Sequence, residues 1–122
     1  MDPNAVHKLN RELHKLLDYM RSMIGALIVD KNGILITSQL PREIEERELG
    51  AIALSMHNSL ETAIESLDQE DVAHISVDLD DLQIILMKNE EILLASVLKY
   101  SADLGMVLIE MEQLLKTSQT FL

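Results

Sequence analysis

The sequence predicts one α+β domain in which three helices and five strands follow the order αββαβββα. Two observations predict this class. The spacing of apolar residues changes along the chain between the period of helices and that of strands, and turn-forming residues stand at the changes. The chain has 122 residues, the usual length of one domain, and contains no internal repeat or linker-like stretch. We therefore expect a single domain over residues 1–122, ordered from about 4 to 117, with a five-stranded antiparallel sheet and helices on both faces.

The first part of the chain predicts a helix followed by a β-hairpin. Between residues 4 and 22, apolar side chains recur at helical spacing, with charged side chains on the other faces. The apolar run 24–29 then precedes Asp30-Lys31-Asn32-Gly33, whose residue types favour a tight turn, and β-favouring residues resume at 34–37. Because the run 24–29 is apolar at odd and even positions alike, we expect this strand to be covered on both faces.

A long second helix is expected over residues 42–67, directly after Pro41. Acidic side chains crowd its first turns, where the helix dipole favours negative charge. They are Glu43, Glu45, Glu46 and Glu48. The apolar stripe that faces the core would consist of Leu49, Ala53, Met56 and Leu60.

Three strand-like segments follow, at 72–79, 82–88 and 92–99, and predict a meander. In the first of them apolar and polar residues alternate, which is typical of an edge strand. Its polar face carries His74, Ser76 and Asp78. The last segment is apolar at both parities and is expected in the centre of the sheet. A third helix over 104–115 ends the domain, with Ser101 as its N-cap.

Composition and charge limit the classes of partner. The formal net charge is −11, and the chain contains no Trp and one Phe. It therefore lacks the positive charge and the aromatic stacking surfaces on which nucleic-acid binding depends, and anionic membranes are disfavoured for the same electrostatic reason. The absence of Cys excludes disulfides and thiolate metal sites, and no signal pattern or membrane-spanning run is present. We expect a cytoplasmic protein that binds neither nucleic acid nor membranes.

Candidate metal ligands lack a recognised spacing. A calcium loop counted from Asp78 would have Gln83 and Asn89 at the places that require Gly and Glu. His7 and His14 lie seven residues apart and share a helix face, but no zinc-binding motif includes them. We expect no bound metal.

Catalytic motifs are missing as well. His57 lies near Ser55 and Glu61 in sequence, but Ser55 is on a different helix face, and no nucleophile motif or oxyanion loop is present. The four glycines are too widely separated to form a phosphate-binding loop. We therefore expect neither enzyme activity nor a cofactor.

The middle of the second helix is unusual because residues 49–60 contain no Asp, Glu, Lys or Arg. At ordinary composition about three charges would be expected in twelve residues. The core stripe given above leaves two further groups, Gly50, Leu54 and His57 on a flank and Ala51, Ser55 and Asn58 facing outward. Gly50 costs the helix about 1 kcal/mol relative to Ala, which is understandable if another backbone approaches closely. Loops of the same chain or a partner helix would cover this face, and we favour the partner.

The predicted edge strand at 72–79 offers unpaired backbone groups that a symmetry mate could bind, which would extend the sheet across a two-fold axis. We expect helix and strand to form one dimer interface. Its residues would be Gly50, Ala51, Leu54, Ser55, His57, Asn58, His74 and Ser76. A Leu54→Glu substitution would then place charge in the seam and yield a monomer.

Two segments carry a resemblance to a known family. The order αββαβββα together with Gly25-Ala-Leu-Ile-Val-Asp-Lys-Asn-Gly-Ile-Leu-Ile-Thr-Ser38 resembles the roadblock family, named for a dynein light chain. The segment Leu93–Leu98 leading to Leu104–Leu108 is similar to that family too, especially to its prokaryotic members that regulate Ras-like GTPases. The resemblance covers about residues 4–117. Profilin-like domains have a similar layering.

The resemblance implies a homodimer, or a heterodimer with a paralogous roadblock protein, built by the second helix and the third strand. It also implies a scaffold or regulator of a small Ras-like GTPase, whose switch regions the second-helix face contacts without supplying a catalytic side chain. The residues expected near that partner are Glu45, Glu46, His57 and Glu61.

Two other classes of function stay open. A light-chain-like adaptor would bind a peptide or larger subunit whatever the nucleotide, and the basic side chains of the first helix suit that role. They are Lys8, Arg11, Lys15 and Arg21. An enzyme or small-ligand sensor would use His57 and nearby carboxylates, although no convergent group of side chains is visible.

Overall fold

The computed structural model describes residues 1–100 and 102–122 and contains the predicted order of elements. These are α1 (Pro3–Tyr19), β1 (Met23–Asp30), β2 (Leu35–Gln39), α2 (Glu46–Ile64), a short 3-10 helix η1 (Glu65–Leu67), β3 (Ile75–Asp78), β4 (Leu82–Lys88), β5 (Ile92–Lys99) and α3 (Leu104–Ser118).

The five strands form one antiparallel sheet in the order β2-β1-β5-β4-β3. The two strands that are apolar at both parities, β1 and β5, lie inside the sheet, and the alternating segment forms the edge strand β3. Ala95 pairs with Leu27 on one side and Leu86 on the other, so the centre of the sheet is buried throughout. The predicted fold is confirmed.

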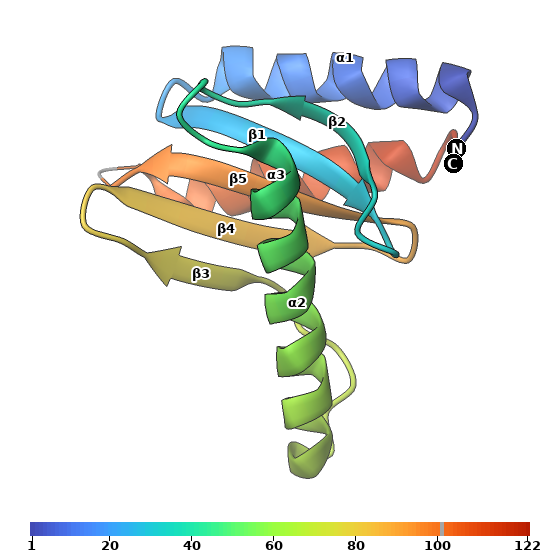
Figure 1. Ribbon diagram of the computed structural model, residues 1–122, viewed down its shortest axis with the longest axis vertical. Coiled ribbons are helices and arrows are strands. Elements are labelled where there is room, and N and C mark those ends of the chain that lie inside the picture. The colour runs from blue at the N-terminus through green and yellow to red at the C-terminus, as the bar shows by residue number, and fades with distance from the viewer. Residues whose placement is uncertain (101) are drawn as a thin grey trace.

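Helices cover both faces of the sheet, with α1 and α3 on one face and α2 on the other (Figure 1). Leucines of α1 and α3 pack on Ile28, Ile85 and Leu94 to form the larger core. The smaller core joins α2 to the other side of the same strands, where Leu27 and Val97 are buried. Because neighbouring residues of a strand point to opposite faces, each central strand contributes to both cores.

The β1–β2 hairpin turns where the sequence predicts. The Asp30 carboxylate accepts hydrogen bonds from the backbone N–H of Asn32 at 2.8 Å and of Ile34 at 3.0 Å. Gly33 adopts a φ of 84°, a left-handed conformation that glycine tolerates without steric cost. These bonds fix the hairpin turn beside α2, where Gly33 approaches Leu54.

Helix ends differ from the sequence prediction by a few residues. α2 begins at Glu46 instead of residue 42, because the Glu45 side chain accepts from the backbone N–H of Arg47 and Glu48 and so caps the helix there. For α3 the cap is Asp103, whose carboxylate accepts from Met106 N at 3.2 Å. Ser101, the expected cap, lies outside the described residues.

The two chain ends lie close together. Met1, Asp2, Phe121 and Leu122 line one hollow beside the β1–β2 turn. Figure 1 places both ends far from the lower end of α2.

Candidate protein-binding face

The first half of α2 is seated on the sheet. Leu49, Gly50 and Ala53 are buried there against Leu27 and Val29 of β1. A Cβ atom at position 50 would lie 2.9 Å from Cγ1 of Val29, so the glycine lets the helix approach its own sheet. This corrects the sequence interpretation of Gly50, which placed it on a flank for a partner helix.

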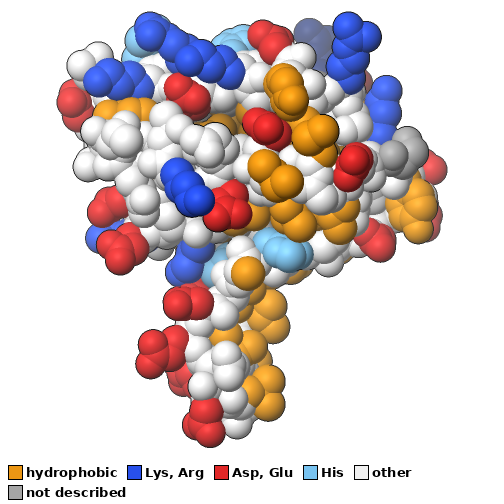
Figure 2. Space-filling view, turned by 180° about the vertical axis from the view of Figure 1, so that it is seen from behind, with side chains coloured by type: hydrophobic (Ala, Val, Ile, Leu, Met, Phe, Trp, Pro, Cys, Tyr) orange, Lys and Arg blue, Asp and Glu red, His pale blue; other side chains and the backbone are white. Residues whose placement is uncertain are grey.

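The second half of α2 begins over the sheet, where Leu54 and Met56 pack on the smaller core, and its end extends beyond the sheet. Figure 1 shows the helix crossing the strands and continuing past β3, and we call the part from Leu54 to Leu67, including η1, the overhang. His57 is its one buried side chain. Met56 and Ile64 are half-buried, and Leu60 and Leu67 are exposed. Figure 2 shows apolar side chains along one side of this projection and acidic ones along the other.

A shallow apolar groove runs between the overhang and β3. Its lining residues are Ser55, Met56, Ser59, Leu60, Ala63 and Ile75. None of them carries a charge, and the edge strand forms one wall. Exposed apolar surface next to an unpaired strand edge is typical of a protein-binding site.

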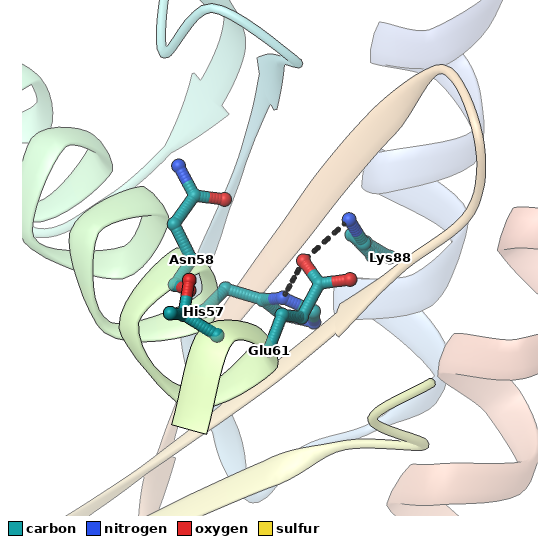
Figure 3. Close-up of polar contacts among 5 residues, drawn as sticks. His57, Asn58, Glu61 and Lys88 are labelled. Carbon is teal, nitrogen blue, oxygen red and sulfur yellow. Dashed lines mark hydrogen bonds and ion pairs between the residues drawn. The ribbon is translucent and has the colours of Figure 1, made fainter. Parts of the chain in front are cut away.

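A small polar network fixes the base of the overhang to the sheet (Figure 3). His57 is fully buried, and its Nδ1 donates to the Glu61 carboxylate at 3.0 Å. Lys88, at the end of β4, donates to the same oxygen at 2.7 Å. The Lys88 hydrogen bond holds the pKa of Glu61 below its ordinary value against the opposing effect of burial, and the His57 bond acts in the same direction as Lys88.

The structure separates the predicted interface residues into two groups. Ala51, Ser55 and Asn58 are exposed on α2, and His74 and Ser76 are exposed at the β3 edge. The other three are buried or half-buried, namely Gly50, Leu54 and His57. Figure 3 shows Asn58 directed away from the network that holds His57.

Two of those three need a correction. Leu54 packs in the smaller core and meets the hairpin, where a Cβ at Gly33 would lie 2.9 Å from its Cδ2. A Leu54→Glu substitution would therefore damage the core as well as any seam. His57 points inward and not toward a partner, because Glu61 and Lys88 offer it a polar partner inside the fold.

The residues expected near a GTPase lie at two places. Glu45 and Glu46 are at the start of α2, where Glu45 is the cap and Ser38 donates its hydroxyl proton to Glu46. Glu61 is just over four turns further along, in the polar network. The structure brings Glu61 and His57 together but leaves the two N-terminal glutamates at the other end of the helix.

Sequence reasoning missed the apolar lining of the groove. It assigned Met56 and Leu60 to the internal core. Met56 does pack on the smaller core, but 38% of the surface of Leu60 is exposed. The available signal was that α2 carries apolar residues on more than one face. One apolar stripe packs on the sheet, and the other is exposed to solvent.

Within the residues that the structure describes, no three His, Asp or Glu side chains lie close enough to hold a metal ion. In the same part of the chain, no helix is both long and apolar enough to cross a membrane.

Comparison with known proteins identifies the family. The family model of the Roadblock/LC7 domain matches residues 9–99, which include the whole sheet. The chain belongs to the Roadblock/LC7 family. The match ends at the last residue of β5, so α3 lies beyond the matched region.

Solved structures agree with this assignment at the level of the fold. Myxococcus xanthus MglB superposes with a TM-score of 0.88 at 15% identity, covering 99% of this chain and 92% of that chain. The Roadblock/LC7 domain from Streptomyces avermitilis gives 0.84 at 18% identity, with coverage of 92% and 95%. Schizosaccharomyces pombe profilin gives 0.66 at 12% identity over 89% of this chain and 94% of its own, which confirms the predicted profilin-like layering. No curated protein sequence matches the chain.

Proposed function

We propose that this Roadblock/LC7 protein forms a two-fold dimer through α2 and β3, and that the dimer scaffolds or regulates a small Ras-like GTPase without supplying a catalytic side chain. The observation that carries the proposal is the overhang, because Leu60 and Leu67 are exposed there beside the apolar groove.

The geometry supports a second copy as the occupant of the groove. If β3 pairs with β3 of another copy, the sheet continues in the direction in which α2 extends past its own edge. Each overhang then lies over the sheet of the other copy, so the exposed surface of Leu60 leaves water. Full burial of an exposed apolar side chain of this size contributes on the order of 1.5–3 kcal/mol, and Leu60, which is 38% exposed, would contribute a fraction of this. A two-fold axis supplies the contact twice.

The proposed interface uses the predicted residues in two ways. Ala51, Ser55 and Asn58 would contact the second copy directly, and His74 and Ser76 would lie in the strand seam. The other three predicted residues, Gly50, Leu54 and His57, would act by setting the depth and direction of α2.

The family resemblance and the similarity to MglB support the regulatory half of the proposal. Two paired α2 helices would present the acidic side chains Glu45 and Glu46 at their N-terminal ends, with Glu61 nearer the seam. Such a face can hold a partner by surface complementarity and charge. The alternative partner within the dimer is a paralogous roadblock chain.

The dimer can be tested with one substitution and its control. Leu60→Glu would place two carboxylates in the seam, so we expect the mass from light scattering to fall from that of two chains to that of one. Ile109→Glu is the control, because Ile109 is 64% exposed on α3, on the other face of the sheet. A wild-type chain that is monomeric at high concentration would refute the dimer.

The GTPase can be tested by capture from lysate of the source organism, with a non-hydrolysable GTP analogue or GDP in parallel. Enrichment of one small GTPase with one nucleotide, and its loss with Leu60→Glu, is the expected result. Recovery of other proteins with both nucleotides would favour the adaptor hypothesis, which the basic side chains along α1 support (Figure 2). If the adaptor hypothesis holds, Arg11→Glu, which reverses one of these charges, should reduce the recovery of those proteins.

A further inference from the structure

The two faces of β3 differ in chemistry. Ile75 pairs with Leu86, which belongs to the core on the α2 side of the sheet. Ser76 pairs with Ile85, which belongs to the core on the α1 and α3 side. Because directly paired residues share a face, Ser76, His74 and Asp78 lie on the α3 side, and Ile75 and Val77 lie on the α2 side under the overhang.

This alternation restricts how β3 can pair with itself. In an antiparallel pair, opposite residues point to the same face, and alternate residues of a strand share a face. When β3 pairs with its own copy about a two-fold axis perpendicular to the sheet, one residue must therefore lie opposite its own copy, and the axis passes between the two. If it passes through Ser76, His74 faces Asp78 of the second copy. If it passes through Val77, His74 faces Asp80. The first register sets a carboxylate of β3 opposite the imidazole, and the second brings the carboxylate of the β3–β4 turn near it, twice in each dimer.

We propose that His74 of each copy pairs with this carboxylate of the other, so that dimer formation is coupled to protonation of His74. The inference rests on the proposed β3 dimer and names the contact that would regulate it.

The surroundings of His74 in one chain leave this role open. A different hollow, separate from the apolar groove, lies beside His74. It is lined by Lys88 of β4 and by Glu112 and Lys116 of α3. Lys88 is paired with Glu61 at 2.7 Å and Lys116 with Glu112 at 3.3 Å, so these charges are already matched. Among the described residues, His74 itself takes part in no ion pair. Its carboxylate would come from the second copy.

The coupling has a definite sign. An imidazolium is stabilised opposite a carboxylate, so a dimer with this contact takes up protons when it forms. Its affinity then rises as the pH falls from 7.5 to 6.0, the range in which histidine ordinarily titrates. Exposed ion pairs are individually weak, and two of them should tighten the dimer about three- to tenfold.

The test is the dimer Kd from sedimentation at pH 7.5 and 6.0 and constant ionic strength. We expect wild type to bind more tightly at pH 6.0 and His74→Gln to lose this dependence. His7→Gln is the matched control, since His7 is exposed on α1 and contacts Arg11 of the same helix. The control should behave like wild type.

Single variants Asp78→Asn and Asp80→Asn then identify the register, because one of them should reproduce the His74→Gln result. A dimer whose pH dependence survives in His74→Gln, or in both Asp variants combined, overturns the contact while the dimer stands. A chain that stays monomeric at both pH values overturns the dimer and the contact together.

Discussion

The two halves of α2 have similar apolar content but different surroundings. The half from Glu46 to Ala53 is capped by Glu45, lies on β1 and approaches so closely that a glycine is required. The overhang beyond it has His57 as its one buried side chain, and it carries apolar residues along a groove open to solvent. The amphipathic pattern of one helix therefore serves two surfaces.

The difference shows that burial in one chain does not account for the whole sequence of α2. In the seated half, Leu49, Gly50 and Ala53 are buried against the chain's own sheet, whereas Ala51 and Ile52 are exposed. In the overhang, Met56 still packs on the smaller core, but Leu60 and Leu67 further along are exposed. Substitutions at matched positions in the two halves should therefore have different consequences for folding and assembly.

The largest contrast is expected between two leucine truncations. Leu49→Ala leaves a cavity in the smaller core and should lower the free energy of unfolding by about 2–4 kcal/mol at any protein concentration. Leu60→Ala should cost single chains less than about 0.5 kcal/mol but weaken the dimer about tenfold. Urea unfolding at low and high protein concentration distinguishes the two. Equal losses would mean that the overhang is held by its own chain.

The next effect concerns how closely the seated half approaches the sheet. Gly50→Val would force side-chain atoms against Val29 and should lower the free energy of unfolding by about 1–3 kcal/mol despite the better helix propensity. Gly105→Ala in α3 is the control, because its new Cβ would be 3.6 Å from Asp103, an ordinary contact. That variant should gain up to about 1 kcal/mol. Thermal or urea unfolding measures both.

A smaller effect should follow when the network at the base of the overhang is broken. Lys88→Met removes the cation beside Glu61 and should cost about 0.5–1 kcal/mol at pH 7. Because the folded chain lowers the pKa of Glu61 from 4.5, this carboxylate stabilises the fold above pH 4.5 and ceases to do so as the pH falls through its lower folded value.

The free energy of unfolding of wild type should therefore decrease more steeply than that of Lys88→Met between about pH 5 and 3. Lys99→Met controls for loss of a positive charge, since Lys99 forms no ion pair among the described residues. If both variants have the same pH profile, Lys88 does not stabilise the Glu61 carboxylate.

The smallest expected effect is at the N-terminus of the seated half. Glu45→Ala removes the side chain that accepts from the backbone of Arg47 and Glu48, and should cost about 0.5–1 kcal/mol. Glu45→Asp should retain most of this stability, because a shorter carboxylate is a good cap. Helix content and urea unfolding check both variants. No loss in Glu45→Ala would show that the first turn of α2 is held by packing alone.

Most of the fold could be predicted because its signals are local. Asp30 and Gly33 specify the hairpin turn, and the alternation at β3 specifies an edge. The runs that became β1 and β5 are apolar at both parities, which is explained by the two cores that they separate. The shift of the α3 cap to Asp103 is also local, but several polar residues compete there and the sequence pattern does not rank them.

The orientation of α2 could not be predicted because it depends on distant residues. Periodicity favoured a stripe through Met56 and Leu60, while the buried stripe runs through Gly50 and His57. Gly50 faces the sheet because a larger residue at this position would collide with Val29. His57 can be buried because Glu61, which also binds Lys88, accepts a hydrogen bond from its ring. Neither contact can be read from the sequence of the helix alone. The periodicity of one chain also cannot distinguish an apolar stripe that faces the core from one that faces outward.

The closeness of the two chain ends has a practical consequence for spectroscopy. Met1 and Leu122 share one hollow, and Figure 1 places them at the far end of the molecule from the overhang. A dye at either terminus therefore reports from the same corner of the fold and leaves the α2 and β3 surfaces unmodified. Energy transfer between two dyes at the ends of one chain would be high in every assembly state and would fall when the chain unfolds. Association would require a dye pair placed elsewhere, such as at the tip of α2.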